Sequence, residues 1–186
     1  MNQFSHQVAA TYLDLPTNLW MPSTTLIKPM HSNQGVLGFI YKFSRHLSLD
    51  VECFYKLMSN LYEYTGVNTM LPQIDHWEEV FSEGLGRAYG AELSIEYRTH
   101  NLQIGANYTL SKSERYFENS YHTWYPDRND NRHRINLTGS YRFNRRFELY
   151  AGWVFHSGNR FTGKSAYVWD DEQGVEYEIY GSPNNY

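Results

Sequence analysis

Apolar and polar residues alternate strictly along the stretch from Tyr89 to Leu110. One side of the alternation carries Tyr89, Ala91, Leu93, Ile95 and Tyr97 and, after a break at residues 99–101, Leu102, Ile104, Ala106, Tyr108 and Leu110. Because successive side chains of a β-strand point to opposite faces, this pattern predicts two strands that each have one apolar and one polar face. The short break between them predicts a hairpin turn.

The same pattern occurs twice more along the chain. It predicts a hairpin at residues 35–57 with its turn at 44–46, and another at residues 134–155 with its turn at 144–146. The apolar sides of these strands carry Leu37, Phe39, Tyr41, Phe43, Leu47, Leu49, Val51, Cys53, Tyr55, Leu57, Ile135, Leu137, Tyr141, Phe143, Phe147, Leu149, Ala151, Trp153 and Phe155. The sequence therefore predicts about six antiparallel strands arranged as three hairpins.

The remaining stretches lack this alternation and are predicted to be loops. Residues 59–85 and 112–131 form two long connections between the hairpins, and residues 157–186 follow the last one. Residues 1–33 contain several prolines and are predicted to form an ordered loop, in which residues 8–12 end an earlier strand.

The arrangement of turns and faces is typical of a transmembrane β-barrel. Such barrels have short turns at one rim, long loops at the other, an apolar face toward lipid with aromatic residues at both interfaces, and a polar lumen. Carboxylates such as Asp50 and Glu52 on the polar face would be costly inside a dry sandwich, so this face is expected to be wet. We therefore predict an all-β fold, an antiparallel transmembrane β-barrel.

Composition narrows the class of protein further. The chain has 186 residues, a net charge of −4 and 17 tyrosines. Its mean hydropathy is −0.65 and it has no apolar run of about 18 residues, which excludes a membrane-spanning helix. The basic residues form no long block of the kind that binds nucleic acid. The single cysteine, Cys53, excludes an internal disulfide and a cysteine zinc site.

No group of residues predicts catalysis or metal binding. The eight histidines are scattered, without the HExxH or HxxxH spacing of a metal site. The run Asp170-Asp171-Glu172 lacks the alternation of a calcium loop and is interpreted as solvated. Glu92 and Glu96 share a polar face that also carries arginines and lysines, so we interpret them as part of a charge-compensated wall. We expect no enzyme activity, catalytic residue, metal or cofactor.

Aromatic residues in the predicted loops are the better candidates for binding a ligand, because aromatic rings stack on sugars and pack on siderophores. The alternative is that these rings pack the loops together or lie at the membrane interface. The candidates are Trp77, Trp124, Tyr125, Tyr167 and Trp169.

Several segments resemble the TonB-dependent receptors of the bacterial outer membrane. They are Gly84 to Leu93, Tyr108 to Ser113, Arg128 to Asn136, Trp153 to Thr162 and Leu15 to Thr24. The resemblance covers nearly the whole chain and is specific for the C-terminal part of the barrel. It implies that residues 1–186 form about six strands of a barrel of roughly 22 strands, which in this family is plugged by an N-terminal domain.

The resemblance also implies a function and a location. It indicates part of an outer-membrane receptor for active uptake of a scarce nutrient, of the siderophore, cobalamin, glycan or peptide class. The implied partners are outer-membrane lipid, the plug and the remaining strands, the inner-membrane TonB energy-transducing complex and a small nutrient ligand, with no nucleic acid. The alternative is a non-transporting β-protein, either a passive porin-like barrel or a soluble aromatic-rich carbohydrate-binding domain.

The chain is expected to be a partial receptor. Six strands are too few to close a membrane barrel, and residues 181–186 follow an upward strand without a descending one. The first fifteen residues lack the basic segment and apolar core of a secretory signal. We expect the plug and the segment that binds the TonB complex to be absent from this sequence.

Overall fold

The computed structural model describes residues 5–8, 19–64, 77–119, 122–170 and 175–180. These residues form antiparallel strands and one short 3-10 helix, and none of them forms a helix long and apolar enough to cross a membrane. The elements are β1 (Ser5–Val8), β2 (Leu19–Pro22), β3 (His31–Lys42), β4 (Leu47–Tyr64), η1 (Trp77–Val80), β5 (Phe81–Arg98), β6 (Leu102–Phe117), β7 (Tyr125–Pro126), β8 (His133–Asn144), β9 (Phe147–His156), β10 (Lys164–Asp170) and β11 (Val175–Tyr180).

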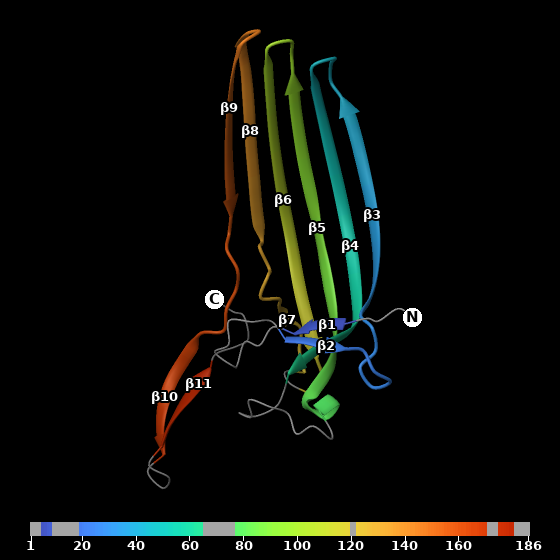
Figure 1. Ribbon diagram of the computed structural model, residues 1–186, viewed down its shortest axis with the longest axis vertical. Coiled ribbons are helices and arrows are strands. Elements are labelled where there is room, and N and C mark those ends of the chain that lie inside the picture. The colour runs from blue at the N-terminus through green and yellow to red at the C-terminus, as the bar shows by residue number, and fades with distance from the viewer. Residues whose placement is uncertain (1–4, 9–18, 65–76, 120–121, 171–174, 181–186) are drawn as a thin grey trace. The chain divides into compact units, whose positions relative to one another are not determined.

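One seven-stranded sheet contains most of these elements. Its order is β3-β4-β5-β6-β8-β9, with the short strand β7 paired to β6 (Figure 1). Neighbours in the sheet are therefore neighbours in the sequence, as in an up-and-down meander. The three predicted hairpins are all present, and the prediction of an all-β, antiparallel fold is confirmed.

The strand register confirms which residues share a face. Leu137 of β8 lies opposite Ala106 of β6 and opposite Trp153 of β9. The next residue, Thr138, lies opposite Gly105 and Gly152. Apolar side chains thus meet apolar side chains across these strands, and small or polar residues meet on the other face.

Each short turn begins with a residue whose side chain accepts hydrogen bonds from the backbone of the turn. The Ser44 hydroxyl accepts from the His46 and Leu47 N–H groups, both at 3.1 Å. The Thr99 hydroxyl accepts from the Leu102 N–H at 3.1 Å, and the side-chain amide oxygen of Asn144 accepts from the Phe147 N–H at 3.0 Å. Such side chains replace the missing partners of a tight turn, which explains why the alternation breaks at these three places.

The two long connections are shorter than predicted because the strands beside them are longer. β4 continues to Tyr64, β5 begins at Phe81 and β6 continues to Phe117, so residues 59–64, 81–85 and 112–117 are strand rather than loop. The alternation fades there because the polar side no longer faces water. The Tyr62 hydroxyl, for example, accepts a hydrogen bond from the Lys28 N–H at 2.9 Å. Residues 65–76 lie outside the described part.

Two further loop predictions are wrong. Residues 157–186, expected to be loop-like, contain the antiparallel hairpin of β10 and β11. Residues 1–33 contain β1 and β2, which pair with each other. β1 ends at Val8, and residues 9–12 of the predicted early strand lie outside the described residues. Strands of four to seven residues at an isolated hairpin have little room to show periodicity.

The chain divides into two compact units. The packed unit comprises residues 1–33, 56–87 and 115–124, and the hairpin unit comprises residues 34–55, 88–114 and 125–186. In the packed unit, Ile27 is buried against Tyr62 and Phe81, and Phe117 is completely buried. A Cβ atom added to Gly84 would lie 2.5 Å from the Phe117 ring, so this glycine makes the space that the ring occupies.

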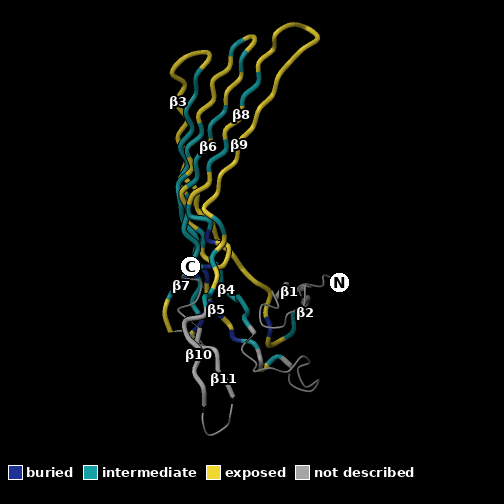
Figure 2. Tube along the Cα trace, turned by 90° about the vertical axis from the view of Figure 1, so that its left-hand side faces the viewer, coloured by how far each residue is buried: buried dark blue, intermediate teal, exposed yellow. Residues whose placement is uncertain are grey.

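In the hairpin unit, by contrast, the strands at the two edges of the sheet are exposed along their length. Figure 2 shows β9 and the turn-proximal part of β3 in the colour of exposed residues. Leu37 of β3 is 79% exposed and Leu149 of β9 is 55% exposed. An apolar surface of this kind needs a non-aqueous environment or a partner.

Candidate functional site

The apolar face of the hairpin unit is a broad surface of large exposed side chains. Across β3, β4, β5, β6, β8 and β9 it carries Leu37, Phe39, Tyr41, Phe43, Tyr55, Ile95, Tyr97, Ile104, Leu110, Leu137, Tyr141, Phe143, Phe147, Leu149, Trp153 and Phe155. Monomeric proteins in water rarely expose apolar patches of more than a few hundred Å². This face is suited to contact with lipid.

Aromatic rings on this face form two bands. The band beside the turns contains the edge-to-face pairs Tyr41–Phe43 and Tyr141–Phe143, with ring centroids 4.7 and 4.8 Å apart. The other band contains the stacked pairs Tyr55–Tyr89, Tyr108–His133 and Trp153–Phe155. From Phe147 to Phe155 along β9 the distance is about 26 Å at the usual rise of about 3.3 Å per residue. Because the strands of transmembrane β-barrels tilt by about 35–45°, this length corresponds to a height of about 20 Å, comparable to the apolar band of about 25 Å that aromatic girdles flank.

The opposite face of the hairpin unit is polar, and many of its charges compensate each other. Arg142 binds the Glu148 carboxylate across β8 and β9, at 3.1 and 3.2 Å. Arg98 forms an ion pair with Glu96, two residues away on β5. The Ser94 hydroxyl donates to Asn107 across β5 and β6. These pairs agree with the charge-compensated wall that the sequence predicts.

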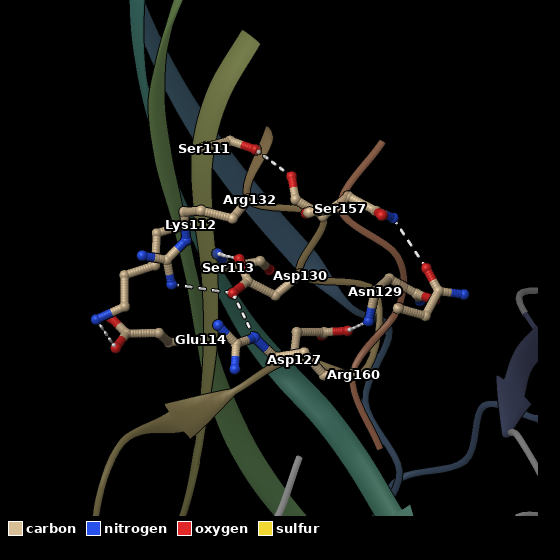
Figure 3. Close-up of polar contacts among 12 residues, drawn as sticks. Ser111, Lys112, Ser113, Glu114, Asp127, Asn129, Asp130, Arg132, Ser157 and Arg160 are labelled. Atoms are coloured by element: carbon tan, nitrogen blue, oxygen red, sulfur yellow. Dashed lines mark hydrogen bonds and ion pairs between the residues drawn. The ribbon is translucent and has the colours of Figure 1, made fainter. Parts of the chain in front are cut away.

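A buried carboxylate, Asp130, organises the segment that leads back into β8 (Figure 3). Its side chain is 1% exposed and accepts three hydrogen bonds. The Ser113 N–H donates to Oδ1 at 2.8 Å, while Arg132 Nη2 and Arg160 Nε donate to Oδ2 at 3.1 and 3.0 Å. Such charge-assisted hydrogen bonds to an ionised group are about twice as strong as neutral ones.

The Asp130 cluster joins three segments that are far apart in the sequence. Ser113 belongs to β6, Arg132 immediately precedes β8, and Arg160 follows β9. Backbone hydrogen bonds support the same junction, because the Asp127 N–H donates to the Ser113 carbonyl and the Arg160 N–H to the Arg128 carbonyl, both at 2.9 Å. The cluster therefore fixes where β8 begins and where the chain leaves β9.

The polar groups of these clusters can bind other groups and hold segments of the chain in position. Among the described residues, no group of three or more histidine, cysteine or acidic side chains is arranged to hold a metal ion. Both oxygens of the Asp130 carboxylate accept hydrogen bonds from within the protein.

Two of the five predicted ligand-binding residues are held within the protein. Trp124 is half-buried, with the Arg87 guanidinium 4.2 Å above its ring and the Tyr116 ring 5.6 Å away, so part of it already makes a cation–π contact. Tyr125 forms part of β7 and is only 5% exposed. Their role in ligand binding stays a prediction.

The other three predicted residues lie on elements that the sequence did not predict. Trp77 begins the 3-10 helix η1. Tyr167 and Trp169 belong to β10, where they lie in register with Glu178 and Glu176 of β11. The side chains of all three are outside the described part of the chain, so their role also stays a prediction.

The residues that sequence reasoning missed are those of the Asp130 cluster. Within the run Asp127-Arg128-Asn129-Asp130-Asn131-Arg132, the charges alternate in sign directly before a predicted strand. This local excess of Asp, Asn and Arg was a usable signal for a polar anchor. Its partners Ser113 and Arg160 were not predictable, because they approach Asp130 only in the folded sheet.

Comparison with protein families agrees with this architecture. The family described as TonB dependent receptor-like, beta-barrel matches residues 4–183. No curated protein and no solved structure matches the chain. The matched range includes all the strands of the sheet, both aromatic bands and the Asp130 cluster. The chain therefore belongs to the TonB dependent receptor-like β-barrel family, whose members are outer-membrane receptors that serve transport rather than enzymes.

Proposed function

We propose that this protein is part of the barrel wall of an outer-membrane receptor that takes up a scarce nutrient. The observation that carries this proposal is the two-faced sheet, with aromatic bands about 26 Å apart on one face and compensated charges on the other. In the family, uptake uses energy from the inner-membrane TonB complex. The proposed partners are therefore outer-membrane lipid, the plug, the TonB complex and a small nutrient ligand.

The unpaired edges of the sheet are an argument that it belongs to a larger barrel. Within the described sheet, β3 and β9 each pair with one neighbour only. In hydrocarbon, every unpaired backbone N–H or C=O group costs several kcal/mol, so these edges require further strands. We infer that residues 1–186 belong to a barrel domain of about 22 strands, the size known for outer-membrane transporters of this kind.

The nutrient is proposed to be of the siderophore, cobalamin, glycan or peptide class. Two of the five aromatic candidates already have partners within the protein. Because Tyr125 is buried and Trp124 already stacks with Arg87, we would test Trp77, Tyr167 and Trp169 first. Replacing each by alanine should weaken ligand uptake without changing the amount of receptor in the outer membrane.

Measuring on which side of the membrane each end of the strands lies tests the proposal directly. In a Cys53→Ala background, single cysteines are introduced at Asn101, in a short turn, and at Asn119, directly after β6. Both positions are exposed, so accessibility depends on the side of the membrane. On intact cells, an impermeant thiol reagent should label the cysteine at 119 and leave the one at 101 unlabelled. After the cells are broken, both should react.

The Cys53→Ala protein without an added cysteine is the control for background labelling. Labelling only at 101 would invert the proposed topology. Equal labelling at both positions in intact cells would contradict a membrane-spanning wall.

A further inference from the structure

Three arginines lie within the strands of the hairpin unit, and one of them differs from the others. Arg98 is paired with Glu96 and Arg142 with Glu148, on the same polar face. The guanidinium of Arg134 forms no hydrogen bond or ion pair with any described residue, although its side chain is exposed on that face. An arginine retains its charge at every physiological pH, so Arg134 offers five N–H donors without a counter-ion.

The neighbours of Arg134 add hydrogen-bonding groups. Thr109 of β6 lies opposite it on one side and His156 of β9 on the other. Directly opposite side chains in an antiparallel sheet are about 5 Å apart, so the three groups form a row about 10 Å long. Asn136 is two residues further along β8 on the same face. None of these four side chains carries a negative charge.

Along this row across the sheet, the first carboxylate belongs to Glu92. The Ser94–Asn107 hydrogen bond fixes the register of β5 and β6, which places Glu92 opposite Thr109 and two strands away from Arg134. No ion pair joins Glu92 to Arg134 in the described chain. On its other side, β5 pairs with β4. The stacked pair Tyr55–Tyr89 marks the register of these two strands, and in this register Glu52 lies opposite Glu92.

The charges of this row are therefore separated across the sheet. Carboxylates lie over β4 and β5, and the guanidinium of Arg134 lies over β8. The cationic end is open to a ligand, because the side chains of Arg134 and His156 are both exposed.

We propose that Arg134 and His156, assisted by Thr109 and Asn136, form a binding site for an oxyanion, a carboxylate or phosphate group of a small ligand that enters the lumen. The planar fork of arginine matches two oxygen atoms of such a group, and hydroxyl, amide and imidazole groups complete the hydrogen bonds. The site rests on the proposed uptake function and adds to it the chemical class of the nutrient, which carries an acidic group.

Inorganic phosphate is a suitable probe for this site. The full-length protein, purified in detergent, is titrated with phosphate by calorimetry in constant chloride, and the arginine Nε–H signals are followed by nuclear magnetic resonance. We expect saturable binding that shifts the Arg134 signal. Arg134→Gln should weaken binding by about tenfold or more, because a charge-assisted pair of hydrogen bonds is lost, and Arg134→Lys should weaken it less.

Three further variants separate this site from general attraction to positive charge. His156→Gln should weaken binding severalfold. Glu92→Gln removes a nearby negative charge and should strengthen it. Arg142→Gln is the matched control, since Arg142 is already paired with Glu148, and it should leave the affinity unchanged. Circular dichroism confirms that each variant is folded.

The inference is wrong if phosphate does not bind saturably, or if Arg142→Gln weakens binding as much as Arg134→Gln. These outcomes are distinguishable from failure of the uptake proposal, because the thiol-labelling experiment tests the orientation of the strands without any anion. A correctly oriented protein without phosphate binding would refute the oxyanion site alone.

Discussion

The two units of the chain use apolar residues in opposite ways. In the packed unit, Phe117 is completely buried and Ile27 is 1% exposed. In the hairpin unit, Leu37 and Phe143 are 79% and 56% exposed, although they lie in regular strands as Phe117 does. The packed unit buries apolar groups in protein, whereas the hairpin unit displays them for a membrane. The difference shows that the apolar face of a β-strand can be covered either by protein or by another apolar environment, and that this cover stabilises the strand.

The comparison predicts the largest loss of stability from the core of the packed unit. Phe117→Ala should lower the free energy of unfolding by about 3–5 kcal/mol, because it removes a fully buried ring and leaves a cavity beside Gly84. Urea-induced unfolding from lipid bilayers measures this loss. Phe143→Ala, on the exposed face of the hairpin unit, is the matched control and should cost at most about 2 kcal/mol. Equal losses would mean that the two units do not differ in packing.

The face assignment of the hairpin unit predicts the next largest effect. Leu137→Arg places a charge on the apolar face and should cost about 2–4 kcal/mol in a bilayer. Thr138→Arg, on the polar face one residue later, should be mild. Folding into bilayers is measured for both variants. A larger loss for Thr138→Arg would show that the polar face, and not the apolar one, contacts lipid.

Within the hairpin unit, the buried Asp130 cluster is expected to contribute to stability through polar contacts. Asp130→Asn should cost about 2 kcal/mol, because two arginines lose their counter-charge at a site where the carboxylate is 1% exposed. The arginines are about one-third exposed, so solvent screening limits the loss.

Glu148→Gln is the control for the Asp130 prediction. Its ion pair with Arg142 is exposed and should contribute less than about 0.5 kcal/mol. Urea unfolding compares the two variants, and limited proteolysis of the segment after β9 should become faster only in Asp130→Asn. Equal stability of both variants would mean that the cluster does not anchor this segment.

The smallest expected effect concerns a single hydroxyl of the packed unit. Tyr62→Phe removes the acceptor of the Lys28 N–H and should cost about 1 kcal/mol. Tyr150→Phe, where the ring is 68% exposed on the hairpin unit, should change stability by less than about 0.5 kcal/mol. The same unfolding measurement tests both. A larger loss for Tyr150→Phe would point to an unrecognised partner of its hydroxyl.

The sequence predicted the hairpin unit better than the packed unit, for a physical reason. Where one face contacts lipid and the other water, each residue such as Leu137 or Thr138 reports its environment directly. Where protein covers the polar face, as around Tyr62 and Phe117, that face no longer needs polar residues, and the strands read as loops. Gly84 and Gly86 serve close packing inside β5.

The sequence by itself determined the fold class, the three hairpins with their turns, and the face on which each strand residue lies, because strand periodicity depends only on local backbone geometry. Only the tertiary structure decided that Ser113, Arg132 and Arg160 meet at Asp130, that Trp124 stacks with Arg87, and that Arg134 lacks a carboxylate partner. These contacts join residues up to 37 positions apart, and the pairing of the strands brings them together. Local patterns carry no information about such distant neighbours.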